Sequence, residues 1–194
     1  MFRGGWATLF AAAVSAAGLS LARVGNAELV SVPLERQAEL LARVASYDRN
    51  MLLRAGSRVQ VLILANDADP DSIGVARRME AVLHSIPDIA GLAHDERIAP
   101  FSSASELARL CRAQHIAIVY FGSGFARDIP AIRQALDGAD ILTVAAVPDY
   151  VELGVVLGFD VLSGRPKLLV HLAQARRQHV DLRADLLKLA RVFE

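Results

Sequence analysis

Apolar and polar positions along the chain follow two periods, which together predict an α/β fold. Nearly continuous apolar runs are typical of strands that are covered on both faces, as in parallel sheets. Such runs lie at 59–65, 116–121 and 141–147, with a less apolar one at 97–101. Apolar residues recur at helical spacing at 33–47, 71–85, around Cys111 and at 126–136. Because strand and helix alternate, we expect a mainly parallel sheet with right-handed crossovers and flanking helices.

The last forty or so residues predict a hairpin followed by a helix. Two apolar runs, 155–161 and 167–172, flank a polar turn at 162–166 that contains glycine and proline. Apolar side chains then recur at helical spacing, at Leu182, Leu186, Leu187, Leu189, Ala190 and Phe193. We therefore expect an antiparallel hairpin at the edge of a mixed sheet and a C-terminal helix that covers it.

The composition is that of a globular protein. The chain has 194 residues, of which 54% are hydrophobic and 22% are charged, and a single folded domain is the default at this length. The 21 basic and 21 acidic residues give a formal net charge of zero. Nucleic acid is therefore not expected as a partner, because domains that bind it present a basic surface.

The N-terminus has the layout of a secretory signal peptide. Arg3 precedes an apolar segment at 6–22, and Gly25 and Ala27 offer the small residues of a cleavage site. We expect a signal peptide at 1–27 and an exported domain at 28–194 that does not insert into the membrane after cleavage. The alternative is an uncleaved membrane anchor, since the apolar segment lies at the short limit for spanning a bilayer.

Cys111 is the single cysteine, so no intramolecular disulfide can form. The apolar phase of its segment places it beside Leu107 and Leu110, which indicates a buried structural thiol. The alternative is a redox-active cysteine or one that bridges two copies of the chain.

Gly122, Ser123 and Gly124 form the most suggestive candidate ligand site. They follow a predicted buried strand and precede a helix, where backbone N–H groups can hold an anion. The G-x-G-x-x-G pattern is incomplete, because position 127 is arginine. A tight turn that needs glycine for its backbone is the alternative interpretation.

Other candidate sites are weaker still. The acidic segment 66–71 lacks the glycine and the distal glutamate of a calcium-binding EF-hand loop, so helix capping explains it better. The five histidines show no helical i, i+3 or i, i+4 pair. Ser123 does not lie in a G-x-S-x-G elbow. We expect no metal ion, no cofactor and no catalytic residues, and therefore not an enzyme.

Several runs in the second half of the chain resemble a known family. The runs are ILTV at 141–144, GVVLGF at 154–159, KLLVHLAQAR at 167–176 and LLKLARV at 186–192. They resemble the YfiR-like family of periplasmic regulators (YfiR/HmsC type). The resemblance implies a non-catalytic α/β domain in the periplasm that restrains an inner-membrane diguanylate cyclase and so limits cyclic di-GMP and biofilm formation. The lone Cys111 departs from the paired cysteines of the best-known members.

The function that we expect is therefore a protein contact. The partner is the periplasmic segment of an inner-membrane diguanylate cyclase or sensor kinase, and a homodimer stays open. Ser163 and Arg165 in the hairpin turn, and the basic pair Arg176 and Arg177, are the candidate docking residues; plain solvated surface is the alternative for each. The competing function is a periplasmic sensor that binds a small ligand at Gly122, Ser123 and Gly124, because ligands favour the carboxyl ends of strands in open α/β sheets.

Overall fold

The structure is a computed structural model that describes residues 29–194, so the signal peptide predicted at 1–27 lies outside the described residues. The strands are β1 (Val59–Ala65), β2 (His94–Pro100), β3 (Ile118–Phe121), β4 (Leu142–Ala145), β5 (Leu157–Leu162), β6 (Arg165–His171) and β7 (Arg191–Phe193). The helices are α1 (Leu34–Ala45), α2 (Met51–Ala55), α3 (Pro70–His84), α4 (Ala104–Ala113), α5 (Ile129–Ala135), α6 (Asp149–Glu152), α7 (Leu172–Arg177) and α8 (Ala184–Leu187).

Within residues 29–194, seven strands form one sheet in the order β2-β1-β3-β4-β5-β6-β7. Strands β1 to β5 run parallel to one another, β6 is antiparallel to β5, and β7 is parallel to β6. The expected mixed, mainly parallel sheet is confirmed. The chain places β2 on one side of β1 and then crosses to place β3 on the other, so the strand order reverses between β1 and β3.

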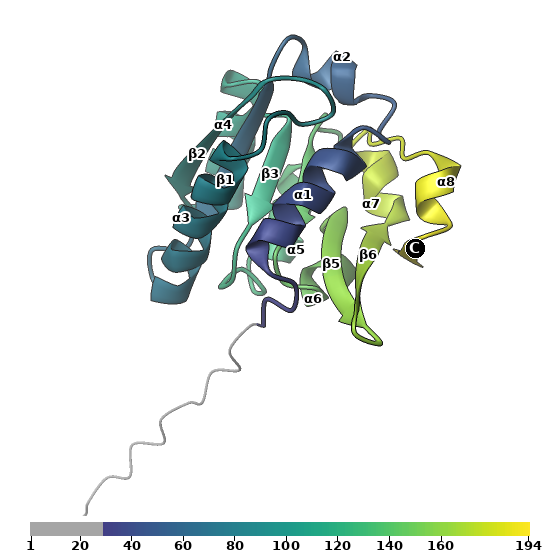
Figure 1. Ribbon diagram of the computed structural model, residues 1–194. Coiled ribbons are helices and arrows are strands. Elements are labelled where there is room, and N and C mark those ends of the chain that lie inside the picture. The colour runs from purple at the N-terminus through teal and green to yellow at the C-terminus, as the bar shows by residue number, and fades with distance from the viewer. Residues whose placement is uncertain (1–28) are drawn as a thin grey trace, which may run out of the picture.

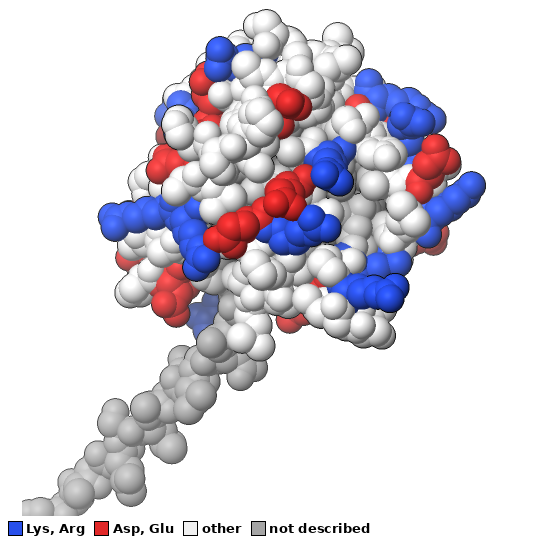
Figure 2. Space-filling view, viewed as in Figure 1, with Lys and Arg blue, Asp and Glu red and all other residues white. Residues whose placement is uncertain are grey.

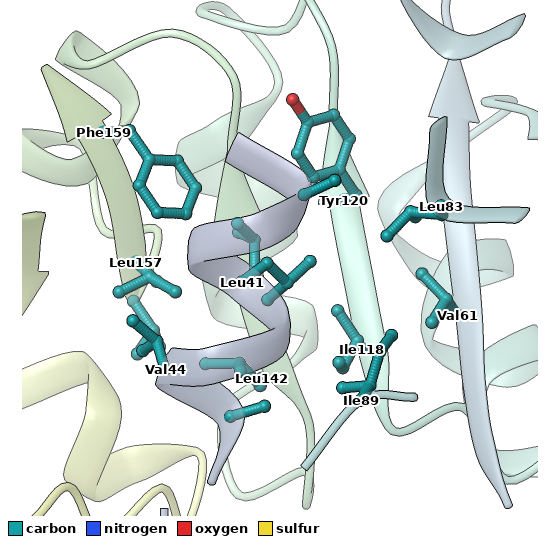
Figure 3. Packing of buried hydrophobic residues seen from close by; sticks show 14 of the residues in the cluster. Leu41, Val44, Val61, Leu83, Ile89, Ile118, Tyr120, Leu142, Leu157 and Phe159 are labelled. Atoms are coloured by element: carbon teal, nitrogen blue, oxygen red, sulfur yellow. The ribbon is translucent and has the colours of Figure 1, made fainter. Parts of the chain in front are cut away.

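Helices cover both faces of the sheet, as the continuous apolar runs predict. Alternate residues of β1 point to opposite faces: Val61 and Ile63 join the cluster under α1 and α3, whereas Leu62 and Leu64 join the cluster under α4 and α5. Figure 3 shows Leu41 of α1 among the side chains of the first cluster. On the face that carries α1 and α3, Figure 2 shows basic and acidic side chains intermixed without a patch of one sign.

The helix starts follow the capping chemistry expected from the sequence. The Ser103 side chain accepts a hydrogen bond from the backbone N–H of Glu106 at the start of α4, and Asp69 accepts one from the N–H of Asp71 at the start of α3. Pro70 occupies the first turn of α3, where its missing N–H costs nothing.

The structure corrects the C-terminal prediction in two places. The helical spacing continues only through α8, and the last residues form β7 instead of extending a helix to Phe193. This strand pairs with the backbone N–H and C=O groups on the outer edge of β6, where Val192 lies opposite Val170. The turn of the hairpin is also shorter than 162–166, because Leu162 and Arg165 already pair as strand residues.

Strand β2 begins at His94, earlier than the predicted run at 97–101. It is an edge strand that pairs only with β1, so its side chains need not be apolar. Asp95, for example, receives hydrogen bonds from Arg58 and Gln60.

Ser163 and Gly164 form the hairpin turn, with φ angles of 51° and 74°. Two positive φ values in succession are typical of a type I′ turn, which matches the twist of the flanking strands. The left-handed backbone conformation is unfavourable for serine, and asparagine adopts it at a lower cost in free energy. We predict that Ser163→Asn raises the free energy of unfolding by about 0.5 kcal/mol and that the β-branched Ser163→Val lowers it. Urea unfolding would measure both, and equal stability of the two variants would contradict this turn geometry.

A buried ion-pair network fastens the C-terminal segment to the junction of α1 and α2. The side chains of Asp48 and Arg54 are 0% and 2% exposed, with their Oδ2 and Nη1 atoms 2.5 Å apart. Arg54 Nε also donates to Asp140 at 2.8 Å. The other Asp48 oxygen accepts the backbone N–H groups of Asn50 and Asp181, at 3.1 and 2.9 Å. The predicted helix at 33–47 ends just before Asp48, and the structure gives this residue an anchoring role.

Candidate functional site

The loops that follow β1 and β3 lie side by side at the point where the strand order reverses. Leu64 pairs with Phe121 at the carboxyl ends of these two strands. The loops are joined directly, because Asn66 Nδ2 donates a hydrogen bond to the backbone oxygen of Gly124 at 2.8 Å. Open α/β sheets bind ligands preferentially outside such a reversal point.

The glycines of the Gly122–Gly124 loop allow α3 to approach closely. A Cβ atom on Gly122 would lie 3.2 Å from Val75 Cγ1. A Cβ atom on Gly124, whose φ is 85°, would lie 2.6 Å from an Asp69 carboxylate oxygen. This packing accounts for both glycines as a tight turn.

Ser123 behaves differently from its neighbours. The residue is 5% exposed. Within residues 29–194 its hydroxyl oxygen is buried and has no hydrogen-bond partner. Buried hydroxyl groups are normally paired, so an orphan of this kind calls for an explanation.

A cavity of about 620 Å³ opens beside Ser123. Its walls come from the segment that leads into α1 and from one side of α3; they are lined by Val30, Ser31, Val32, Pro33, Leu34, Glu35, Pro70, Asp71, Gly74, Val75 and Arg78, together with Ser123. The sequence identified Ser123 but not the wall formed by residues 30–35, which include the start of the predicted helix at 33–47. The only sequence signal for this wall was that α1 and α3 each begin at a proline, Pro33 and Pro70.

An ion pair lies at the open side of this cavity. Arg78 Nε and Nη2 both donate to Oε1 of Glu35, at 3.1 and 2.7 Å. The hydrogen bond from Arg78 lowers the pKa of the Glu35 carboxyl, which therefore stays ionised. Both side chains are at least half exposed, so the pair contributes little to stability and can exchange partners.

The acidic segment 66–71 caps a helix, as expected. Asn66 Oδ1 accepts the N–H of Ala68 at 3.1 Å, in addition to the cap formed by Asp69. Among residues 29–194 no group of three or more His, Cys, Asp or Glu side chains could hold a metal ion. His84 and His94 share the Glu96 carboxylate. The Nδ1 atoms of the two rings lie 2.8 and 2.9 Å from its oxygens, within hydrogen-bond distance.

The β5–β6 hairpin projects beyond the sheet. Strand β5 pairs with β4 only at Leu157 and Gly158, and β6 pairs with β7 only from Leu169 onward. Residues 159–168, called here the hairpin arm, therefore form strand pairs only with each other. Phe159 at the base of the arm is buried in the core, and Figure 1 shows the far end of the arm protruding from the body of the domain. Ser163 and Arg165 lie exposed at its tip.

Two apolar side chains are exposed on the hairpin arm: Val161, from the predicted strand at 155–161, and Leu162, from the predicted turn at 162–166. Val161 is 41% and Leu162 is 54% exposed. The arm's backbone edges are less available: Asp160 Oδ1 accepts the N–H of Val161 at 2.7 Å, and Pro166 has no N–H to donate. The arm thus offers side chains, more than a free strand edge, to a partner.

Arg176 and Arg177 do not share a surface with the arm tip. They lie exposed on α7, beyond the opposite end of β6. Seven residues of strand span roughly 20 Å, so the two candidate docking features are separate. Arg177 also has a local acidic neighbour, with Nη1 3.6 Å from Asp137 Oδ2.

Cys111 is a buried structural residue, 2% exposed in the core under α4. Burial raises the pKa of its thiol from 9.0 to about 12. Because the folded state favours the neutral thiol, the contribution of the thiol to the free energy of unfolding is complete below pH 9 and is lost as the pH rises toward 12.

We predict that iodoacetamide leaves Cys111 unmodified at neutral pH until urea unfolds the protein. Rapid alkylation of the folded protein would contradict this.

A family model described as YfiR/HmsC-like matches residues 72–191. None of the curated proteins compared with the chain matches it. Among residues 29–194, no helix has both the length and the apolar character that crossing a membrane requires.

Solved structures share the fold at low sequence identity. A conserved domain protein from Vibrio cholerae O1 biovar El Tor is 13% identical, with a TM-score of 0.55, over 84% of this chain and 60% of that one. The ABC domain in complex with L-Trp from Streptococcus pneumoniae is 13% identical, with a TM-score of 0.56, over 84% and 62%. A ligand-free, open substrate binding protein from Clostridium difficile is 10% identical, with a TM-score of 0.57, over 75% and 57%. The chain thus spans about 60% of the length of these structures, and the likeness shows the α/β fold alone.

Proposed function

Because the chain belongs to the YfiR/HmsC-like family, whose members are periplasmic regulators and not catalysts, we propose that it restrains an inner-membrane signalling protein. The proposed target is the periplasmic segment of a diguanylate cyclase, with a sensor kinase as the alternative target. Export with removal of residues 1–27 is part of the proposal. Loss of the contact would release the cyclase, raise cyclic di-GMP and favour biofilm formation.

The observation that carries this proposal is the hairpin arm. Val161 and Leu162 expose apolar surface on an element that projects from the domain, where a partner can reach it. Arg165 and Lys167 lie on the paired strand and supply basic side chains around that surface. An apolar centre with a charged rim is typical of a protein contact, in which a few buried apolar side chains supply most of the affinity.

The contact would act by shifting a population. A regulator that binds the inactive state of the cyclase better than the active state biases the enzyme toward inactivity. A tenfold bias requires a difference in binding free energy of about 1.4 kcal/mol. One well-buried leucine from the arm is of that order, so a small surface is sufficient.

Deleting the gene tests the regulatory function directly. We expect cyclic di-GMP to rise and to return to the original level when the wild-type gene is supplied in trans. The purified protein should also retain an inner-membrane cyclase or sensor kinase from detergent-solubilised membranes. Unchanged cyclic di-GMP in the deletion strain, with no such protein retained, would overturn the proposal.

A further inference from the structure

The cavity between α1 and α3 has the features of a small-molecule site, independently of the proposed regulatory function. It lies at the carboxyl ends of β1 and β3, at the reversal of strand order, where α/β sheets bind ligands. Its volume of about 620 Å³ falls within the range of ordinary ligand pockets. The unpaired Ser123 hydroxyl is a second and independent sign, because a ligand would supply its missing partner.

The two ends of the cavity differ in chemistry. Ser123, 5% exposed, forms the buried end; its hydroxyl oxygen is covered in the free protein, so the side chain has to turn toward the cavity to hydrogen-bond a ligand. Arg78, whose side chain is 67% exposed, lies at the open side. Between them the lining is mostly apolar, with Val32, Leu34 and Val75 among the wall residues. A ligand that fits would carry a hydrogen-bonding group at one end, an apolar body, and a charge at the other end.

The sign of that charge follows from what Arg78 already holds. Arg78 donates to the Glu35 carboxylate through Nε and Nη2, so this guanidinium is positioned to bind a carboxylate. Helices α1 and α3 both begin at the cavity, and their N-termini favour negative charge. α1 has no side-chain cap that would compete for its first N–H groups. The Glu35 carboxylate thus occupies the position where a ligand anion would bind, and the two compete for the Arg78 guanidinium.

We propose that this cavity binds a small carboxylic acid with an apolar or aromatic body and a hydroxyl or carbonyl group at the far end. The ligand carboxylate binds Arg78, displacing Glu35. The far polar group bonds to the Ser123 hydroxyl. Asp71, the other acidic residue in the lining, lies exposed in the first turn of α3 and is already balanced by that helix N-terminus.

Four related probes test the proposal by calorimetry and by ligand-dependent thermal stabilisation of the purified protein. The probe that matches the cavity is 4-hydroxyphenylacetate. Phenylacetate lacks the hydroxyl, 4-hydroxyphenylacetamide lacks the charge, and tyramine reverses the charge. We expect 4-hydroxyphenylacetate to bind best and tyramine not to bind. Absence of binding by both carboxylates, or equal binding of tyramine, would overturn the proposal.

Matched variants assign the contacts. Arg78→Ala should weaken 4-hydroxyphenylacetate binding at least about tenfold, whereas Arg77→Ala, on the same helix but outside the cavity, should not. Glu35→Gln should strengthen binding, because it removes the competing carboxylate. Ser123→Ala should abolish the preference for 4-hydroxyphenylacetate over phenylacetate. Unchanged affinity in Arg78→Ala, or weaker binding in Glu35→Gln, would contradict the assigned geometry.

A cavity-filling variant separates loss of the site from loss of the fold. Gly74 lies on α3 in the lining, and a Cβ atom there would meet nothing within 4 Å. Gly74→Leu should therefore abolish probe binding and still raise the melting temperature, because glycine is a poor residue inside a helix. Binding that survives in a stably folded Gly74→Leu protein would place the ligand elsewhere and overturn the proposal.

Discussion

Asp48→Ala is expected to lower the free energy of unfolding by about 3–5 kcal/mol, the typical cost of removing one partner of a buried ion pair, although Arg54 keeps its contact with Asp140. The Arg54 side chain, 2% exposed, would lose the partner that lies 2.5 Å away. The backbone N–H groups of Asn50 and Asp181 would lose their acceptor as well. Because a domain of this size is typically stable by about 5–15 kcal/mol, the variant should be close to unfolding. Urea denaturation would measure the change.

Asp181→Ala is the matched control for this prediction. Asp181 pairs with Arg49 on the surface, where the two side chains are 52% and 60% exposed. An exposed pair is screened by water, so its loss should cost less than about 1 kcal/mol. Equal losses in the free energy of unfolding for Asp48→Ala and Asp181→Ala would show that burial of the network does not determine how much it stabilises the fold.

Leu162→Asp is expected to release the partner while the fold is retained. Leu162 is 54% exposed near the tip of the hairpin arm, so a charge there stays in water in the free protein but would be buried in a complex. Loss of a central apolar contact of this kind typically costs about 2 kcal/mol or more, which is about thirtyfold in affinity. In cells, the variant should raise cyclic di-GMP toward the level of the gene deletion.

Leu53→Asp is the control for the arm variant. Leu53 is 84% exposed on α2, which Figure 1 shows at the opposite end of the molecule from the hairpin arm. This substitution should leave cyclic di-GMP at the wild-type level. If Leu53→Asp raised cyclic di-GMP and Leu162→Asp did not, the docking surface would lie away from the arm.

The central strands could be predicted because burial on both faces leaves a clear signal. Val59–Ala65 is a nearly pure apolar run, and the structure reproduces it as β1 residue for residue. The predicted run at 97–101 misses the start of β2 because His94, Asp95 and Glu96 are polar, as an edge strand that pairs with β1 on one side allows. The last residues were misassigned because Val192 and Phe193 fit a helical spacing as well as a short strand. Only the free edge of β6 decides between the two.

The candidate sites show the same limit. Ser123 stood out in the sequence between two glycines, but its missing partner and the wall formed by residues 30–35 depend on how α1 packs against α3. Val161 could not be recognised as exposed, because it ends an apolar run that is typical of a buried strand; β5 extends past Gly158, the last residue that pairs with β4. Exposure of an apolar residue is thus set by the length of a neighbouring strand, which no local pattern records.

Site-specific photocrosslinking from position 162 in living cells tests the regulatory contact most directly. A photoreactive residue at this position on the hairpin arm is predicted to form a crosslink to one inner-membrane protein, a diguanylate cyclase or a sensor kinase. The same residue at position 53 should not form it. A crosslink of equal strength from both positions, or none to any membrane signalling protein from position 162, would contradict the proposal that the arm restrains such a partner.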